Sequence, residues 1–345
     1  MEAFMKKRLL LLASMGAWCL AGCAGIDRDS AKALGNAGFT AAQAVQQQSD
    51  AASKTLSSLP EWWGVRDALV CANIKAPDIM KACLDNVRKQ ATQAQPDTAL
   101  GQDQNRLVEL MAKRAKAAGA LRDAYQSFVN LASYDAGAEA ESALKAAFGA
   151  INDFSAAASA ISPAGAALPA IASGFASKAS TIGGFLAAER QQRLMLDASQ
   201  DLHRATDAFI AALSVERDKA ASESLLATLR TEQDTVYSAF VQSGLISPKD
   251  ALTPLLHEIA PGAQIVSLPP GANLDAINTA SVISLHERSK RQQKAVVAAY
   301  DAALAALKAL SAQHARLEAR EPLDLATILG EARNVKAILA DLQGK

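Results

Sequence analysis

The chain has 345 residues, and its 35 lysine and arginine residues balance 35 aspartate and glutamate residues. A neutral chain lacks the basic field that draws nucleic acid from a distance, so no nucleic acid partner is expected. Half of the residues are hydrophobic, yet only 5% are aromatic, and alanine supplies much of the difference. Because alanine is the best helix former, this composition predicts an all-α, elongated helical bundle.

The first residues form a short apolar segment behind a basic patch. Lysine and arginine at residues 6–8 precede an apolar run over residues 9–20, which ends in Leu20-Ala21-Gly22-Cys23. The run is shorter than the roughly 20 apolar residues that a transmembrane helix needs. A basic patch, a short apolar run and small residues before a cleavage site are the parts of a secretory signal peptide. The alternative is a buried N-terminal helix with an incidental cysteine.

The Leu20-Ala21-Gly22-Cys23 sequence resembles the lipobox of bacterial lipoproteins. The resemblance implies that residues 1–22 are removed as a signal peptide and that acyl chains such as palmitate attach Cys23 to membrane lipid. Two or more such chains give stable attachment without a spanning helix. With Ala24 directly after this cysteine, the sequence resembles lipoproteins that are exported to the outer membrane. We therefore expect a protein on the outer membrane that faces the periplasm, with residues 23–30 as a lipidated tether.

Cys71 and Cys83 are the two cysteines that remain once Cys23 carries lipid, because the fourth cysteine lies within the cleaved segment. In an oxidising compartment such a pair predicts a disulfide. Pro77 lies between them, where a helix would break and turn. Two free thiols or a metal site are the alternatives, and the metal site lacks nearby histidines. We expect residues 31–96 to contain N-terminal helices with a Cys71–Cys83 hairpin.

In residues 97–345, apolar residues recur every three, four or seven positions and so form one apolar face of a helix, which we call a seam. This is the pattern of long helices packed like a coiled coil. The seams and a final amphipathic helix cover residues 105–132, 194–240, 274–317 and 325–342. A proline-rich loop over residues 243–272 interrupts the bundle. Within it, Ser247-Pro248 is expected to start a short helix, and residues 264–268 are the only strand candidate.

Residues 154–188 are rich in alanine, glycine and serine, and Lys178 is the only charged residue among them. We expect a helix to begin at Pro163, with Pro169 in its first two turns. One interpretation is an apolar helical hairpin that enters a bilayer, similar in layout to the tongue of α-helical pore-forming proteins. The other, which we favour, is a bundle section in which small residues let helices touch.

No catalytic or cofactor motif stands out in the sequence. The four histidines lack the spacing of a metal site, and the chain has no nucleophile elbow, P-loop or dinucleotide-binding glycine pattern. His314 falls on a helical seam, which indicates a partly buried core histidine. The histidines are His203, His257, His286 and His314. We therefore expect no catalytic residue, no cofactor and no metal, and an enzyme is not expected.

Two further groups of charged residues are candidate sites. The carboxylate pairs are Glu139 with Glu141 and Asp201 with Asp207, and such pairs are typical of solvated helix faces. A basic cluster at residues 288–294 could bind lipid headgroups, although its position within a long helix favours a solvent-exposed face.

These observations predict a membrane-anchored periplasmic lipoprotein that acts as a non-enzymatic helical scaffold or interaction module. Cys23 would bind membrane lipid, and an envelope protein of unknown identity would be the partner. The alternative is a membrane-active protein that inserts residues 154–188. A third, weaker hypothesis is a binder of apolar ligands between bundle helices.

Overall fold

A computed structural model describes most of the chain after residue 25. The described residues are 26–57, 59–92, 99–133, 136–161, 168–175, 185–217, 231, 233–262 and 271–342. They form helices joined by turns and extended segments, without a β-strand among them. The labelled helices are α2 (Arg28–Ser57), α3 (Leu59–Ala72), α4 (Pro77–Thr92), α5 (Ala99–Ser133), α6 (Gly137–Ile161), α7 (Phe185–Arg217), α9 (Pro248–Ile259), α10 (Leu274–Ala319) and α11 (Ala326–Leu342). Residues 233–242 form a further helical segment.

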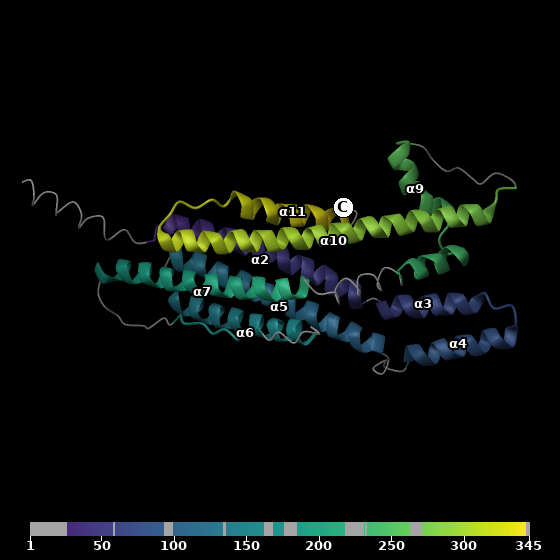
Figure 1. Cartoon of the computed structure of the whole chain (residues 1–345), viewed down its shortest axis with the longest axis horizontal. Coiled ribbons are helices and arrows are strands. Elements are labelled where there is room, and N and C mark those ends of the chain that lie inside the picture. Colours follow the sequence, from purple (N-terminus) through teal and green to yellow (C-terminus); the bar gives the residue numbers. More distant parts are fainter. Residues whose placement is uncertain are drawn as a thin grey trace, which may run out of the picture.

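The fold is an elongated bundle in which α2, α5, α6, α7, α10 and α11 pack lengthwise (Figure 1). The α3–α4 hairpin, α9 and the first half of α10 extend beyond the bundle at one end, which we call the distal end. The opposite end, where α2 begins, is the proximal end. At a rise of 1.5 Å per residue, the 46 residues of α10 alone span about 70 Å.

The predicted seams face the core. Leu121, Phe128, Met195, Leu202 and Phe209 are all at most 1% exposed. Between these large side chains the core contains many buried alanines from α2, α5, α7 and α10. Because alanine adds little volume, helix axes come close together, and the slender all-α bundle that we expected is confirmed.

A close helix contact lies between α2 and α5. A Cβ atom added to Gly38 would collide with the ring of Tyr125, and one added to Gly35 would lie 2.6 Å from Cγ2 of Val129. The two glycines are one helical turn apart on α2, so they present a shallow face against which the bulky side chains of α5 pack.

The helices α6 and α7 run in the same direction. Arg204 lies over the ring of Phe148, and Phe209 contacts Phe154, so residue numbers rise together along the pair. A connection between parallel helices must return along the length of the bundle. Residues 168–175 form part of that return as an extended segment beside α6 and α7, which we call the return segment.

The structure corrects two expectations from the sequence. Residues 168–175 are not helical, so the helix expected from Pro163 does not include Pro169 in its first turns. Residues 26–30, which were expected to belong to the tether, do not, because Ile26 is buried and α2 begins at Arg28. A helix starts at Pro248, as predicted, whereas the strand candidate at residues 264–268 lies outside the described residues.

The close contact between Gly38 and Tyr125 generates a stability prediction. We expect Gly38→Ala to lower the free energy of unfolding by about 1–3 kcal/mol, because the new methyl group overpacks a closed contact. Gly149→Ala on α6 is the control, since a Cβ there meets nothing within 4 Å. That change should be neutral or stabilising by up to about 1 kcal/mol. Urea unfolding followed by circular dichroism measures both. Equal midpoints for the two variants would contradict the close-packing argument.

Candidate functional site

Cys23, the expected lipid attachment residue, lies outside the described residues. From Ile26 onward the chain is held by burial and hydrogen bonds. Ile26 is 6% exposed and belongs to the main core. The carboxylate of Asp27 accepts hydrogen bonds from the backbone N–H and the hydroxyl of Ser30, at 2.9 and 2.8 Å. These bonds cap the start of α2 and hold the pKa of Asp27 below its usual value.

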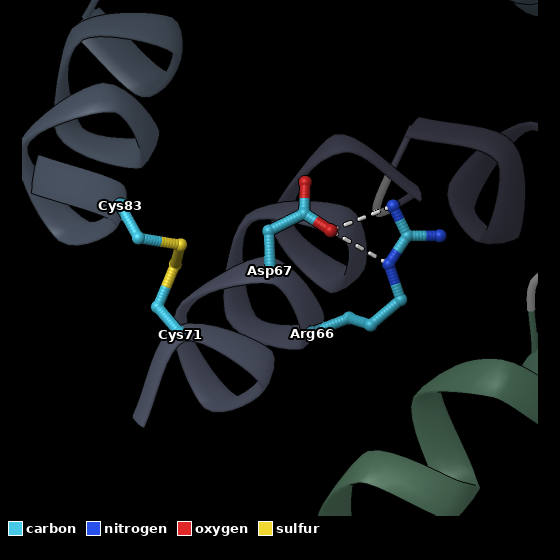
Figure 2. Close-up of a disulfide and its surroundings, with 4 residues drawn as sticks. All are labelled: Arg66, Asp67, Cys71 and Cys83. Atoms are coloured by element: carbon cyan, nitrogen blue, oxygen red, sulfur yellow. Dashed lines mark hydrogen bonds and ion pairs between the residues drawn. A yellow bond between two sulfur atoms is a disulfide. The ribbon is translucent and has the colours of Figure 1, made fainter. Parts of the chain in front are cut away.

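The predicted disulfide between Cys71 and Cys83 is confirmed. It joins α3 to α4, with Cα atoms 5.6 Å apart (Figure 2). The turn between the two helices covers residues 73–76, and Pro77 is the first residue of α4. Cys71 is buried, and its helix carries an adjacent ion pair between Arg66 and Asp67. The disulfide holds together two short helices that extend beyond the main bundle.

A closed polar cluster lies in the middle of the bundle, around His314 of α10. Nε2 of His314 is 2.8 Å from the hydroxyl of Tyr125 on α5, and Nδ1 is 2.8 Å from the hydroxyl of Ser199 on α7. The Tyr125 hydroxyl is also 2.8 Å from that of Thr206. We call these four residues the core polar cluster. All of them are 0% exposed.

Burial determines the charge state of the core polar cluster. Desolvation, followed by the nearby charge of His203, lowers the pKa of His314 to about 3, so the ring is neutral at pH 7. Desolvation also raises the pKa of Tyr125 well above its usual value. A serine hydroxyl beside a histidine ring can act as a nucleophile activated by a base. Ser199 and His314 are both fully buried, however, so neither side chain is accessible to a substrate in this arrangement. The cluster therefore joins α5, α7 and α10 through satisfied buried hydrogen bonds.

Charged residues surround one side of this cluster. His203 stacks on His314 with ring centroids 5.9 Å apart. Nδ1 of His203 lies 3.2 Å from the carboxylate of Glu318, and Nε2 lies 3.6 Å from that of Asp207. Asp207 also accepts a 2.5 Å hydrogen bond from Ser311. This half-exposed group links α7 to α10.

The carboxylate pairs considered from the sequence do not form acid/base pairs. Asp201 bonds to the return segment and Asp207 to α10, so the two serve separate contacts. Glu141 forms an ion pair with Lys145. In the basic cluster, Lys290 pairs with Glu287, and Arg291 lies 3.5 Å from Glu258 of α9. Such exposed pairs are typical of solvated helix faces.

The return segment is held through its backbone. The amide of Asn152 donates to the carbonyl of Ile171 at 2.7 Å and accepts from the N–H of the same residue at 3.0 Å. The side chain of Asp201, only 3% exposed, accepts from the hydroxyl of Ser173 and the N–H of Phe175, at 2.6 and 3.0 Å. Phe175 itself is buried in the main core.

Sequence reasoning missed a buried ion pair between α5 and α7. The guanidinium of Arg114 lies 2.7 Å from the carboxylate of Glu216, donates to Ser49 of α2 at 2.8 Å, and faces the ring of Tyr300 of α10 at 5.4 Å. Arg114 is 2% exposed. The only signal in the sequence is a charged residue within an alanine-rich apolar seam, because the partners come from distant segments.

Among the described residues, no group of three histidine, cysteine, aspartate or glutamate side chains could hold a metal ion. By length and composition, α10 is the one described helix that could cross a membrane, but Leu307 and Leu310 within it pack in the bundle core. Comparisons with protein-family models, with curated proteins and with solved structures gave no match.

The buried neutral state of His314 predicts a pH dependence of stability. An unfolded histidine has a pKa near 6.5, so the unfolded chain binds more protons than the folded one between about pH 3 and 6.5. Stability should therefore decrease as the pH falls below about 6.5, by roughly 1 kcal/mol per pH unit from this residue. Urea midpoints between pH 7.5 and 5 measure it. His314→Gln should reduce the slope, while His257→Gln at an exposed position should leave it unchanged.

The contacts of Asn152 generate a second prediction. Asn152→Ala removes both bonds to the backbone of Ile171, which should cost about 1–2 kcal/mol of stability. Hydrogen exchange measured by mass spectrometry should become faster in the peptide that contains residues 168–175. Asn130→Ala, which removes one 3.4 Å surface bond on α5, is the control. Unchanged exchange in the Asn152 variant would show that other contacts hold the return segment.

Proposed function

We propose that this protein is a membrane-anchored lipoprotein of the cell envelope that acts as a non-enzymatic helical scaffold or interaction module. The observation that carries the proposal is Leu20-Ala21-Gly22-Cys23 directly behind a short apolar run and a basic patch. The lipid-bearing residue would be Cys23. By the same resemblance, Ala24 favours the outer membrane, with the bundle in the periplasm.

Two structural features support this role. The Cys71–Cys83 disulfide suits an oxidising compartment. The elongated body, with α2 starting at the proximal end and the α3–α4 hairpin at the distal end, suits a spacer that carries a surface away from a membrane (Figure 1).

The distal end also carries most of the exposed large hydrophobic side chains among the described residues, as expected for an interaction module. Eight of the ten large hydrophobic side chains that are exposed among the described residues lie on α3, α4, α9, the turns beside α9 or the first part of α10. They are Val65, Val70, Ile79, Leu245, Leu255, Ile259, Leu274 and Ile283. Apolar groups gathered in one region commonly mark contact sites for proteins, which supports an envelope protein as partner.

The alternative function is insertion of residues 154–188 into a bilayer. Within this stretch, the bonds of Asn152 and Asp201 to the return segment and the burial of Phe175 would have to be lost first. These contacts support the scaffold proposal over the alternative. Leakage of dye from vesicles on addition of a non-lipidated variant would favour membrane insertion.

Metabolic labelling with palmitate tests the anchoring proposal. The full-length chain should incorporate label and fractionate with membranes, and Cys23→Ser should abolish both, because the thiol that forms the thioether is lost. Cys19→Ser is the matched control, since it changes a cysteine four residues earlier that belongs to the removed segment; it should keep the label. A labelled Cys23→Ser variant would contradict the proposal.

The membrane of residence is tested with the same fractions. The unmodified protein should be found with the outer membrane, and Ala24→Asp should move it to the inner membrane if the residue after the cysteine directs sorting. Recovery of both proteins in the inner membrane would contradict the outer-membrane location while leaving lipid attachment intact.

A further inference from the structure

The described chain is fixed almost from the proposed lipid attachment residue onward. Ile26 is buried in the main core, and the backbone carbonyl of Asp27 accepts from the N–H of Ala31 at 3.0 Å. Only Ala24 and Gly25 separate Cys23 from Ile26. A fully extended chain covers at most 3.3–3.6 Å per residue, so Cys23 lies within about 10 Å of a core residue of the bundle.

The start of α2 is part of a broad proximal end rather than a projecting arm. The guanidinium of Arg28 bonds to the amide oxygen of Gln191 near the start of α7, and that amide donates to the carbonyl of Leu131 near the end of α5 at 2.8 Å. The end of α10 and its connection to α11 lie at the same end of the bundle (Figure 1).

We propose that the proximal end contacts the phospholipid headgroups of the membrane that holds Cys23. The bundle is then in direct contact with the bilayer and is not separated from it by a flexible tether. This inference rests on the proposed function, since it requires acylated Cys23. An acyl chain must enter the hydrocarbon layer, and a connection of about 10 Å brings the bundle end into the headgroup region.

The chemistry of this end suits a headgroup layer. Its exposed side chains carry both signs: Arg28 and Asp29 at the start of α2, Glu189 near the start of α7, and Arg320 with Glu321 after α10. Zwitterionic headgroups offer both a phosphate and an ammonium group, so mixed charges can be satisfied there. The distal end would then be held on the order of 60–70 Å from the membrane surface.

Position relative to the membrane can be measured with single fluorescent labels. With Cys23 acylated and Cys71 bonded to Cys83, an introduced cysteine is the only free thiol. Glu321→Cys places a label at the exposed proximal end, and Ile259→Cys places one on α9 at the distal end, where Ile259 is 75% exposed. The purified lipoprotein is incorporated into phosphatidylcholine vesicles that contain a phospholipid with a nitroxide on its headgroup.

We expect the label at residue 321 to lose most of its fluorescence and the label at residue 259 to keep it. A bundle that lies flat on the membrane would quench both labels, and a bundle on a long tether would quench neither. Either result would overturn the proposed arrangement.

A lengthened connection is the control. Ten glycine and serine residues inserted after Gly25 add a flexible spacer of about 17 Å r.m.s. length, so quenching at residue 321 should fall while that at residue 259 stays low. Unchanged quenching at residue 321 would show that another contact holds the bundle on the membrane. Palmitate content measured on each sample separates the two proposals. Protein that carries no palmitate overturns the lipoprotein assignment and this inference together. Protein that carries palmitate but shows no quenching at residue 321 overturns this inference alone.

Discussion

The bundle depends on the placement of one side chain, Tyr125. Its ring fills the space left by the missing side chain of Gly38, which brings α2 against α5. Its hydroxyl lies within hydrogen-bond distance of Thr206 on α7 and His314 on α10. A bulky ring and a polar tip thus join four helices at one point. In a core made largely of alanine, whose packing alone specifies helix register weakly, such directional bonds distinguish the native alignment of the helices from shifted ones.

Helix content, seam residues and the disulfide could be predicted from the sequence because each depends on local spacing. Leu121, Met195 and Phe209 were identified by their period, and Cys71 with Cys83 by their number and the proline between them. The return segment could not be predicted, since alanine and glycine allow both helical and extended backbone; bonds from Asn152 and Asp201, which are distant in sequence, decide the outcome. The full burial of His314 was likewise underestimated, because its seam position gave no sign of the tyrosine and serine partners supplied by α5 and α7.

The two ends of the molecule differ in their side chains. Hydrogen bonds at the proximal end link α2, α7 and α5, and this end bears charges of both signs. The distal end is thinner, is braced by a disulfide and presents apolar side chains such as Val70 and Ile79. Between them, the Arg114–Glu216 pair and the core polar cluster join α5 to α7 at two levels along the bundle.

The short separation of the two disulfide cysteines has a consequence for the order of folding. Cys71 and Cys83 are 12 residues apart. If Cys23 carries lipid and Cys19 is removed with the signal peptide, as proposed, a single pairing is open to them. Closing so small a loop takes far less time than assembling helices that are more than a hundred residues apart, such as α2 and α10. Contact between the two thiols can therefore precede assembly of the bundle, whereas the covalent bond forms at the rate that the oxidant sets.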